Sequence, residues 1–285
     1  MISCARAANG KKGTESLDSR KPSPKPSLRL QHFLALCGLG SRRACERLID
    51  SGRVAVDRVV IRRQGVCVHP AIQRVEVDGR PVCPESKIYL LLNKSRDIVC
   101  TASDPQGRRT FRTLLPASLG KRVFTVGRLD QSSEGLLVVT NDGELAHALM
   151  HPRHNVEKVY YVWIRRPLIP DEEQRLRHGV RSQGETLVLD EMTRSKTSGR
   201  ARDGVPYRVR IREGRNRHIR RMFEAVGVGV VRLQRVAVGP LELGSLRSGG
   251  WRYLQEREVQ ALWDYIHEQS VKRSNKGIQK SGFRS

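Results

Sequence analysis

Apolar residues alternate with arginines along one segment in the last third of the chain. The segment reads Tyr207, Arg208, Val209, Arg210, Ile211 and Arg212. Successive side chains of a strand point to opposite faces, so this pattern buries the apolar set and displays a row of arginines. Residues 159–164 are rich in aromatic and β-branched side chains, which is typical of a strand. The fold therefore needs a sheet that has a buried face and a partly basic outer face.

Helical segments are interspersed irregularly among such strands. One apolar helical face, with i, i+3, i+4, i+7 spacing, comprises Ile219, Met222, Phe223 and Val226. On this helix we expect Arg221 to point away from the apolar face, and Arg220, at its edge, to reach inward over the sheet. Short apolar runs at 88–92 and 136–139 predict buried strands. The irregular order predicts an α+β fold with a large, mostly antiparallel mixed sheet.

Composition and prolines divide the chain into four parts. Residues 1–26 are rich in Ser, Pro, Gly and Lys, which predicts a disordered basic arm. Pro81 and Pro84 mark a boundary between a small domain, 27–83, and a larger domain, 84–270. Residues 271–285 carry basic side chains and no acid, which predicts a disordered basic tail.

The small domain has two predicted helices and a cluster of arginines. The first helix ends at Gly38, Ser41 is a plausible N-cap of the second, and short strands follow. Arginines gather at the start of the second helix and just beyond it: Arg42, Arg43, Arg47 and Arg53. An arginine run on a helix is often only a solvated face. Here the concentration favours a phosphate-binding surface.

The charge balance indicates the kind of partner. The chain has 53 Lys and Arg against 29 Asp and Glu, a formal net charge of +24. Such an excess, spread over the folded parts, favours nucleic acid as the partner over an anionic membrane surface. We see no membrane-spanning run or secretion signal, and the six cysteines form no CxxC pair. The histidines are scattered, and Pro152 is expected to break the helix that would align His147, His151 and His154, so we predict no metal site.

Two stretches of sequence resemble known families. Leu30 to Ile49, followed by Ser51 to Val56, resembles an S4 RNA-binding domain, which implies recognition of structured RNA. Gly127 to Leu145 resembles the signature of the S4-carrying rRNA pseudouridine synthase family, and later motifs match it in order over about residues 86–260. These motifs include Glu157–Tyr160, Glu213–Met222 and Arg232–Arg235. Within that family, Asp104–Gly107 and Glu213–Arg217 are most similar to the large-subunit enzymes.

The resemblance also gives roles to single residues. By spacing alone, Asp130 is better explained as a turn aspartate, and Tyr160 as a core aromatic. The family motif instead implies that Asp130 is the catalytic carboxylate, that Tyr160 is the active-site tyrosine and that Arg220 is the partner that keeps Asp130 charged. Arg128 matches the residue that fills the space left by a flipped base. Further RNA contacts are expected from Lys158, Arg235, Arg208, Arg210, Arg212, Arg215 and Arg217.

The implied reaction is the isomerisation of uridine to pseudouridine in large-subunit ribosomal RNA. It involves no redox change and no group donor, so no cofactor is expected. We expect a cytoplasmic enzyme, a monomer, with ribosomal RNA as its partner. Two alternatives stay open: a small-subunit rRNA synthase, and a non-catalytic S4-type RNA-binding factor for ribosome assembly.

Overall fold

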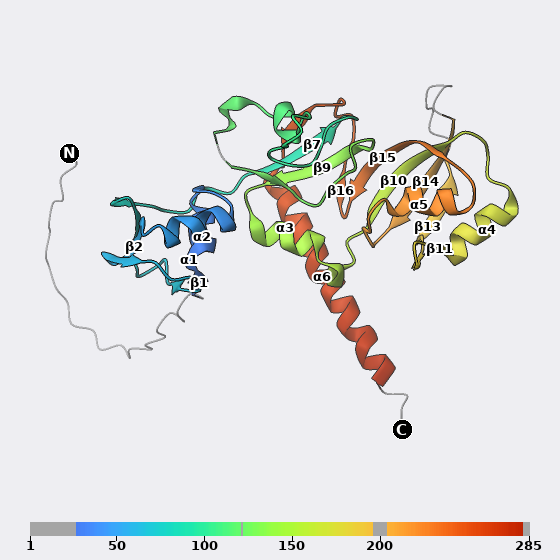
Figure 1. The fold of residues 1–285 in the computed structure, drawn as a ribbon. Helices are drawn as coiled ribbons and strands as arrows, with labels where there is room; N and C mark the ends of the chain where they lie inside the picture. The colour runs from blue at the N-terminus through green and yellow to red at the C-terminus, as the bar shows by residue number, and fades with distance from the viewer. Residues whose placement is uncertain (1–26, 121, 196–203, 282–285) are drawn as a thin grey trace, which may run out of the picture. The chain divides into compact units, whose positions relative to one another are not determined.

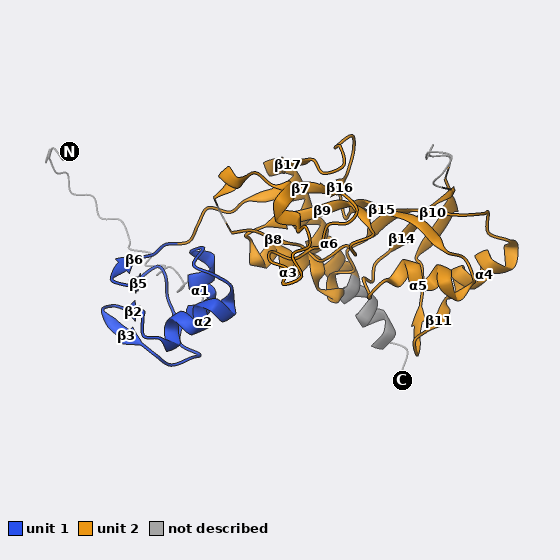
Figure 2. Ribbon diagram, turned by 45° about the horizontal axis from the view of Figure 1, so that its top comes forward, with its two compact units in different colours: residues 1–83 blue, residues 84–285 orange. Residues whose placement is uncertain are grey.

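The computed structural model describes residues 27–120, 122–195 and 204–281. The arm predicted over residues 1–26 lies outside the described residues, as do residues 282–285 of the predicted tail. The chain divides into two compact units, residues 1–83 and 84–285 (Figure 2). Each unit has its own hydrophobic core.

Unit 1 packs two helices against a small antiparallel sheet. Its elements are β1 (Leu28–Arg29), α1 (Leu30–Leu36), α2 (Arg42–Asp50), β2 (Val54–Val56), β3 (Val59–Ile61), β4 (Cys67–Val68), β5 (Val75–Val77) and β6 (Arg80–Pro81). Ser41 caps α2 as predicted, because its hydroxyl accepts a hydrogen bond from the Ala44 amide at 3.1 Å. The sheet order is β3-β2-β5-β6. Alternate residues of β2 and β5, such as Val54 and Val75, are buried under the helices.

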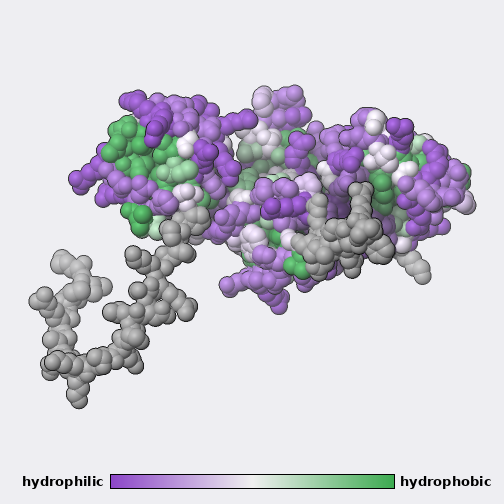
Figure 3. Space-filling view, turned by 90° about the horizontal axis from the view of Figure 1, so that it is seen from below, coloured by the Kyte–Doolittle hydropathy of each residue, from purple (hydrophilic) through white to green (hydrophobic). Residues whose placement is uncertain are grey.

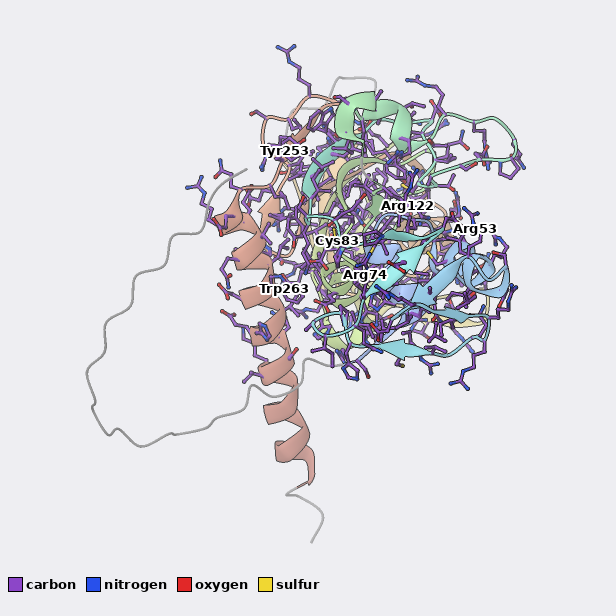
Figure 4. All side chains as sticks on the ribbon, turned by 90° about the vertical axis from the view of Figure 1, so that its left-hand side faces the viewer. Arg53, Arg74, Cys83, Arg122, Tyr253 and Trp263 are labelled. Carbon is purple, nitrogen blue, oxygen red and sulfur yellow. The ribbon has the colours of Figure 1, made fainter. Side chains whose placement is uncertain are left out.

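The surface of unit 1 is not uniformly basic. Arg53 forms a bidentate ion pair with Asp78, and Arg74 pairs with Glu76 at 2.7 Å; the two arginines directly precede β2 and β5 (Figure 4). Hydrophobic residues also gather on one face of this unit (Figure 3). Val59 and Val60, on the edge strand β3, are 63% and 55% exposed.

Unit 2 is built around one twisted sheet (Figure 1). Its main path is β13-β14-β10-β15-β9-β7-β17, with β16 and β8 attached to β15 and β9. The strands are β7 (Tyr89–Lys94), β8 (Phe124–Thr125), β9 (Glu134–Thr140), β10 (Lys158–Ile164), β13 (Glu191–Arg194), β14 (Val205–Ile211), β15 (Val230–Val238), β16 (Leu241–Glu242) and β17 (Trp251–Tyr253). All neighbours in it are antiparallel except β15 and β9, so the predicted mixed, mostly antiparallel sheet is confirmed.

Helices cover both faces of the sheet, which explains why β9 is buried along its whole length. Leu136 and Val138 face a core shared with α3 (Gly143–Met150) and α6 (Glu256–Ser281). Leu137 and Val139 face the other core, which includes the apolar side of α5 (His218–Ala225) and Leu176 of α4 (Pro170–His178). The period of two in a strand sends successive residues to these two cores. The small hairpin β11 (Val180–Ser182) and β12 (Glu185–Leu187) packs beside α5.

The parallel contact between the described strands β9 and β15 depends on a glycine. Gly135 is paired with Arg235 across β9 and β15 and has a φ of +107°. A Cβ at this position would lie 2.1 Å from the Arg235 carbonyl oxygen. Only glycine therefore allows the two strands to approach this closely. This contact joins the β7–β9 part of the sheet to the β10–β15 part.

The surroundings of Arg221 and the course of the chain after residue 270 add to what the sequence indicates. Arg221, which was expected to point away from the apolar face of α5, is 7% exposed; its guanidinium donates to the Ser182 carbonyl at 2.6 Å and pairs with Glu185 at 3.1 Å. The hairpin β11–β12, which the apolar pattern does not indicate, covers this side of α5. Helix α6 runs on through residues 271–281, within the stretch predicted as a tail. An i, i+4 ion pair between Glu268 and Lys272 supports the helix just before that stretch and at its start.

A search of the described residues for a helix long and apolar enough to span a membrane finds none.

Candidate active site

A pocket of about 660 Å³ opens in unit 2 beside the start of β9, and it contains most of the predicted site residues. The loop after β8, the starts of β10 and α5, the end of α3 and the middle of β15 all contribute to its wall. The predicted residues that line it are Arg128, Asp130, Lys158, Tyr160, Arg212, Arg215, Arg217 and Arg235. The fold thus brings together positions more than one hundred residues apart in sequence.

Asp130 lies in the turn between β8 and β9 and is half-buried. The Ser133 amide donates to its backbone carbonyl at 3.0 Å, which closes the turn. Two cations interact electrostatically with this carboxylate. Burial lowers the pKa of both Lys94 and Arg220, and attraction to Asp130 offsets part of this decrease. Asp130 therefore stands in a positive field on the wall of the pocket.

Tyr160 and Arg235 lie side by side on neighbouring strands. They are register partners across β10 and β15, and their exposed fractions are 7% and 4%. The Nε of Arg235 donates to the Leu136 carbonyl at 2.8 Å, so this side chain is held within the sheet. The Tyr160 ring presents one edge of the apolar core to the pocket.

Lys158 lies two residues before Tyr160 on the same face of β10. Its ammonium donates to the Val156 carbonyl at 2.9 Å. Burial, and then repulsion from Arg235, lower the pKa of Lys158 to about 8. The group therefore changes charge close to neutral pH.

Arg220 does not form the direct ion pair with Asp130 that the sequence predicts. Its guanidinium donates instead to the Ser132 carbonyl at 3.3 Å and to the Val230 carbonyl at 3.1 Å. The first of these bonds ties Arg220 to the turn that carries Asp130. The Arg220 Nε has no hydrogen-bond partner among the described residues, so one N–H donor of its guanidinium is left without an acceptor there.

The predicted basic row on β14 is largely neutralised by acids. Arg210 pairs with Glu191 at 2.9 Å, and Arg212 pairs with Asp190 at 2.9 Å. Glu191 is the first residue of β13 and Asp190 directly precedes it, and β13 pairs with β14. Arg208 and Arg210 do not line the pocket. In the same way Arg215 pairs with Glu213 at 2.9 Å and Arg217 with Glu224 at 3.2 Å, although both arginines line it.

The remaining predicted RNA contacts are exposed arginines. Arg128 is exposed on the pocket wall. On unit 1, Arg42, Arg43 and Arg47 are exposed on α2, whereas Arg53 has its guanidinium occupied by Asp78. Arg42, Arg43 and Arg47 thus present positive charge on the surface of α2.

Two residues near Asp130 could not be recognised from the sequence. Lys94 has no exposed surface, and its ammonium donates to the carbonyls of Ile98 at 2.8 Å and Gln131 at 3.3 Å. The one sequence feature that could have indicated this buried lysine is its place at the end of the apolar strand β7. Ser133, 1% exposed, lines the pocket with a hydroxyl that has no partner among the described residues.

Three histidines, His147 in α3 and His151 and His154 just after it, lie closer together than the sequence suggests. The ring centroids of His147 and His151 are 5.1 Å apart, and those of His151 and His154 are 6.1 Å apart. A 3-10 turn, Pro152–His154, carries the chain on past the proline. His154 Nδ1 lies 2.9 Å from the Ser270 hydroxyl of α6, so this cluster packs between helices. No group of three metal-ligating side chains occurs among the described residues.

Comparisons with known proteins identify the class to which this pocket belongs. The sequence matches the RNA pseudouridylate synthase family over residues 88–225. An uncharacterized RNA pseudouridine synthase of Aquifex aeolicus is 36% identical over 250 residues, which cover 87% of this chain and 99% of that protein. Ribosomal large subunit pseudouridine synthase B of Bacillus subtilis is 37% identical over 237 residues, 82% of this chain and 95% of that protein.

A solved structure is also similar. A crystal structure of pseudouridylate synthase aligns with a TM-score of 0.57 and 26% identity, over 83% of this chain and all of that one. The chain belongs to the RNA pseudouridylate synthase family. The family inferred from the motifs around Asp130 is therefore confirmed, and with it the class of enzyme, an isomerase that acts on RNA.

Proposed function

We propose that this chain converts uridine to pseudouridine in large-subunit ribosomal RNA, with Asp130 as its catalytic carboxylate. The observation that carries this proposal is that Asp130 and Tyr160 line one pocket together with Lys158 and Arg235. The target class is supported by relatives from Bacillus subtilis and Haemophilus influenzae that are named ribosomal large subunit pseudouridine synthase B.

The reaction needs an ionised carboxylate close to the sugar. The bond between N1 and C1′ breaks, the uracil turns, and C5 bonds to C1′; C5 loses a proton and N1 gains one. Three roles for Asp130 fit this reaction: it attacks the sugar, it attacks the base, or it removes the 2′ proton. Each role requires the charged form of the carboxylate.

Tyr160 and Arg220 assist from two sides. The Tyr160 ring stacks on the uracil, and its hydroxyl helps to remove the C5 proton. Arg220 positions the turn that carries Asp130 through its hydrogen bond to the Ser132 carbonyl. Lys158 and Arg235 supply positive charge at the base of the same pocket.

The target uridine has to leave its stack to enter the pocket. Extruding a base costs a few kcal/mol, and binding energy from the rest of the RNA offsets this cost. Arg128, exposed on the pocket wall, fills the space that the extruded base leaves. We propose that unit 1 is an S4-like RNA-binding domain that supplies part of the binding energy through Arg42, Arg43 and Arg47.

The other functions compatible with the sequence are weaker. A non-catalytic assembly factor would have no need for Asp130, Tyr160, Lys158 and Arg235 to line the same pocket. A small-subunit target is the closer alternative, because it differs only in which RNA is bound.

Mapping pseudouridines tests the proposal directly. Ribosomal RNA is compared between cells that express this chain and cells that lack it, by carbodiimide modification and reverse transcription. One or more sites missing from large-subunit RNA supports the proposal. A missing site in small-subunit RNA identifies the alternative target, and unchanged maps contradict the enzymatic role in ribosomal RNA.

A further inference from the structure

A second, smaller pocket adjoins the first on the other side of Arg128. It has a volume of about 350 Å³, near the lower end of the roughly 300–1,000 Å³ typical of small-molecule sites. Its walls come from residues 99–108 and from residues 128–131. Val99, Cys100 and Leu129 give it an apolar side, whereas Arg108, Arg128 and Gln131 give it a polar one. A site of this size and character suits one flat heterocycle.

Arg108 on this wall is fixed in place by Asp104. The guanidinium donates to both carboxylate oxygens of Asp104, with Nε–Oδ2 at 3.0 Å and Nη2–Oδ1 at 2.7 Å. The Arg108 amide also donates to Oδ2 at 2.9 Å. These hydrogen bonds hold the pKa of the Asp104 carboxyl at about 2, so the carboxylate stays charged at physiological pH.

The pairing makes Arg108 better suited to a base than to a phosphate. The Asp104 carboxylate is 4% exposed and neutralises the guanidinium along one edge, while the Arg108 side chain remains 43% exposed. A neutralised cation attracts phosphate weakly. Its planar face, held still by two bonds, remains a good platform for stacking, because binding a base then restricts little further conformational freedom.

The position of this pocket indicates which base it would take. Arg128, Leu129 and Asp130 line both pockets, so the two sites share a wall. When one nucleotide of an RNA strand lies in the larger pocket, the next nucleotide of that strand can therefore reach the smaller pocket. Two adjacent sites that share the wall with Asp130, the smaller of which adds no further proposed catalytic group, suit two nucleotides of one RNA strand.

We infer that the pocket between Asp104–Arg108 and Arg128–Gln131 binds the nucleobase next to the target uridine, stacked on the Arg108 guanidinium. This inference rests on the proposed function, because it takes the larger pocket as the site of the reacting uridine. It assigns to the loop around Asp104 a role in choosing the sequence context of the modified uridine. The bound ligand is a nucleobase, not a free phosphate.

Binding of defined RNAs to the full chain tests this inference. The probes are stem–loop RNAs with a single loop uridine, in which each neighbouring nucleotide is made abasic in turn. We expect one abasic position to weaken binding to the wild-type chain by about tenfold, the usual scale for one stacked base. In Arg108→Ala the intact RNA should bind about as weakly as the abasic RNA, so that the difference disappears.

Arg109 provides a matched control. It is the next residue, is also exposed and carries the same charge, but does not line the pocket. Arg109→Ala should keep the full abasic penalty, even if its overall affinity falls because one positive charge is removed. Asp104→Ala should show a much smaller penalty although it makes the chain more basic, because Arg108 is then no longer held flat.

The outcomes separate this inference from the proposed function. An abasic penalty that is absent in the wild-type chain, or that is the same in Arg108→Ala as in wild type, overturns the inference. Equal decreases in affinity for every RNA in Arg108→Ala and Arg109→Ala do so as well, because they indicate a simple charge effect. Pseudouridine formation is measured separately on intact RNA, and its absence in the wild-type chain counts against the proposed function alone.

Discussion

The Lys94 ammonium donates a hydrogen bond to the Gln131 carbonyl oxygen, directly after Asp130 in the chain. The same oxygen accepts a bond from the Asp97 amide at 2.9 Å. Lys94 is fully buried at the end of β7, and burial lowers its pKa. The turn that carries Asp130, the proposed catalytic carboxylate, is therefore anchored from inside the sheet, by a group that costs free energy to bury.

Replacement of Lys94 by methionine should lower kcat more than it changes the KM for RNA. The substitution keeps the length of the side chain but removes the donor that fixes Gln131, and small displacements of a reacting group cost roughly 10–100-fold in rate. Steady-state kinetics on an RNA substrate measures both constants. Lys272→Met is the control, since Lys272 lies on α6 with its side chain 66% exposed and paired, within the described part of the chain, only with the exposed Glu268. A change confined to KM would show that Lys94 acts on binding.

Substitution of Asp130 by asparagine should abolish pseudouridine formation and leave RNA affinity largely intact. The amide has almost the same shape as the carboxylate but can neither carry the charge nor act as a base or nucleophile. Turnover is followed by release of tritium from RNA labelled at C5 of uridine, and affinity by filter binding. Asp171→Asn, an exposed carboxylate on α4, should have full activity. Near-normal turnover in Asp130→Asn would remove the catalytic assignment.

Local patterns predicted the elements around the site well. The alternation at 207–211, the helical face at 219–226 and the Ser41 cap all correspond to observed structure. Each of these depends on neighbours in sequence, which a period or a cap residue reports directly. The family motif around Asp130 then identified the region of the chain where the large pocket lies.

Interactions between distant segments were harder to predict. No pattern in the sequence indicates that Glu191 lies opposite Arg210, since strand pairing is set by the whole sheet. For the same reason the apolar pattern of α5 does not indicate that the β11–β12 hairpin covers Arg221. The bond from Arg220 to the Ser132 carbonyl joins residues 88 positions apart, and no local pattern reports it.

Gly135→Ala should destabilise the chain by roughly 2–4 kcal/mol, because the new Cβ meets the Arg235 carbonyl and the residue keeps a positive φ. The strands β9 and β15 would have to separate, which also moves Tyr160 and Arg235 relative to Asp130. Urea unfolding measures the change. Gly143→Ala, at the start of α3 with open space around it, is the control and should be neutral or slightly stabilising. Equal stability of Gly135→Ala and wild type would contradict the close approach.

The charge of Lys158 should produce a fall in RNA affinity as the pH rises through about 8, its pKa in the folded chain. Above this pH the amine is neutral and contributes no attraction to RNA. Lys158→Arg keeps its charge and should show no such fall. Stability should change in the opposite direction: between about pH 8 and 10.4 the unfolded chain holds a proton that the folded chain has released, so this group stabilises folding as pH rises. Affinity is measured by titration at several pH values, and a fall that persists in Lys158→Arg would assign the effect to another group.

The double substitution Arg43→Ala and Arg47→Ala should weaken RNA binding and flatten its dependence on salt. Both side chains are exposed and lie one helical turn apart on α2, so they can bind neighbouring phosphates. Removing one arginine–phosphate interaction reduces the slope of log K against log salt by roughly 0.7–0.9, so the slope should fall by about 1.5. Arg43→Lys with Arg47→Lys keeps the charge and should keep the slope. Activity at saturating RNA should change little, because these arginines belong to unit 1 and the proposed active-site pocket belongs to unit 2. An unchanged salt slope in the alanine variant would mean that α2 does not bind RNA phosphates, and the proposed role of unit 1 would then be wrong.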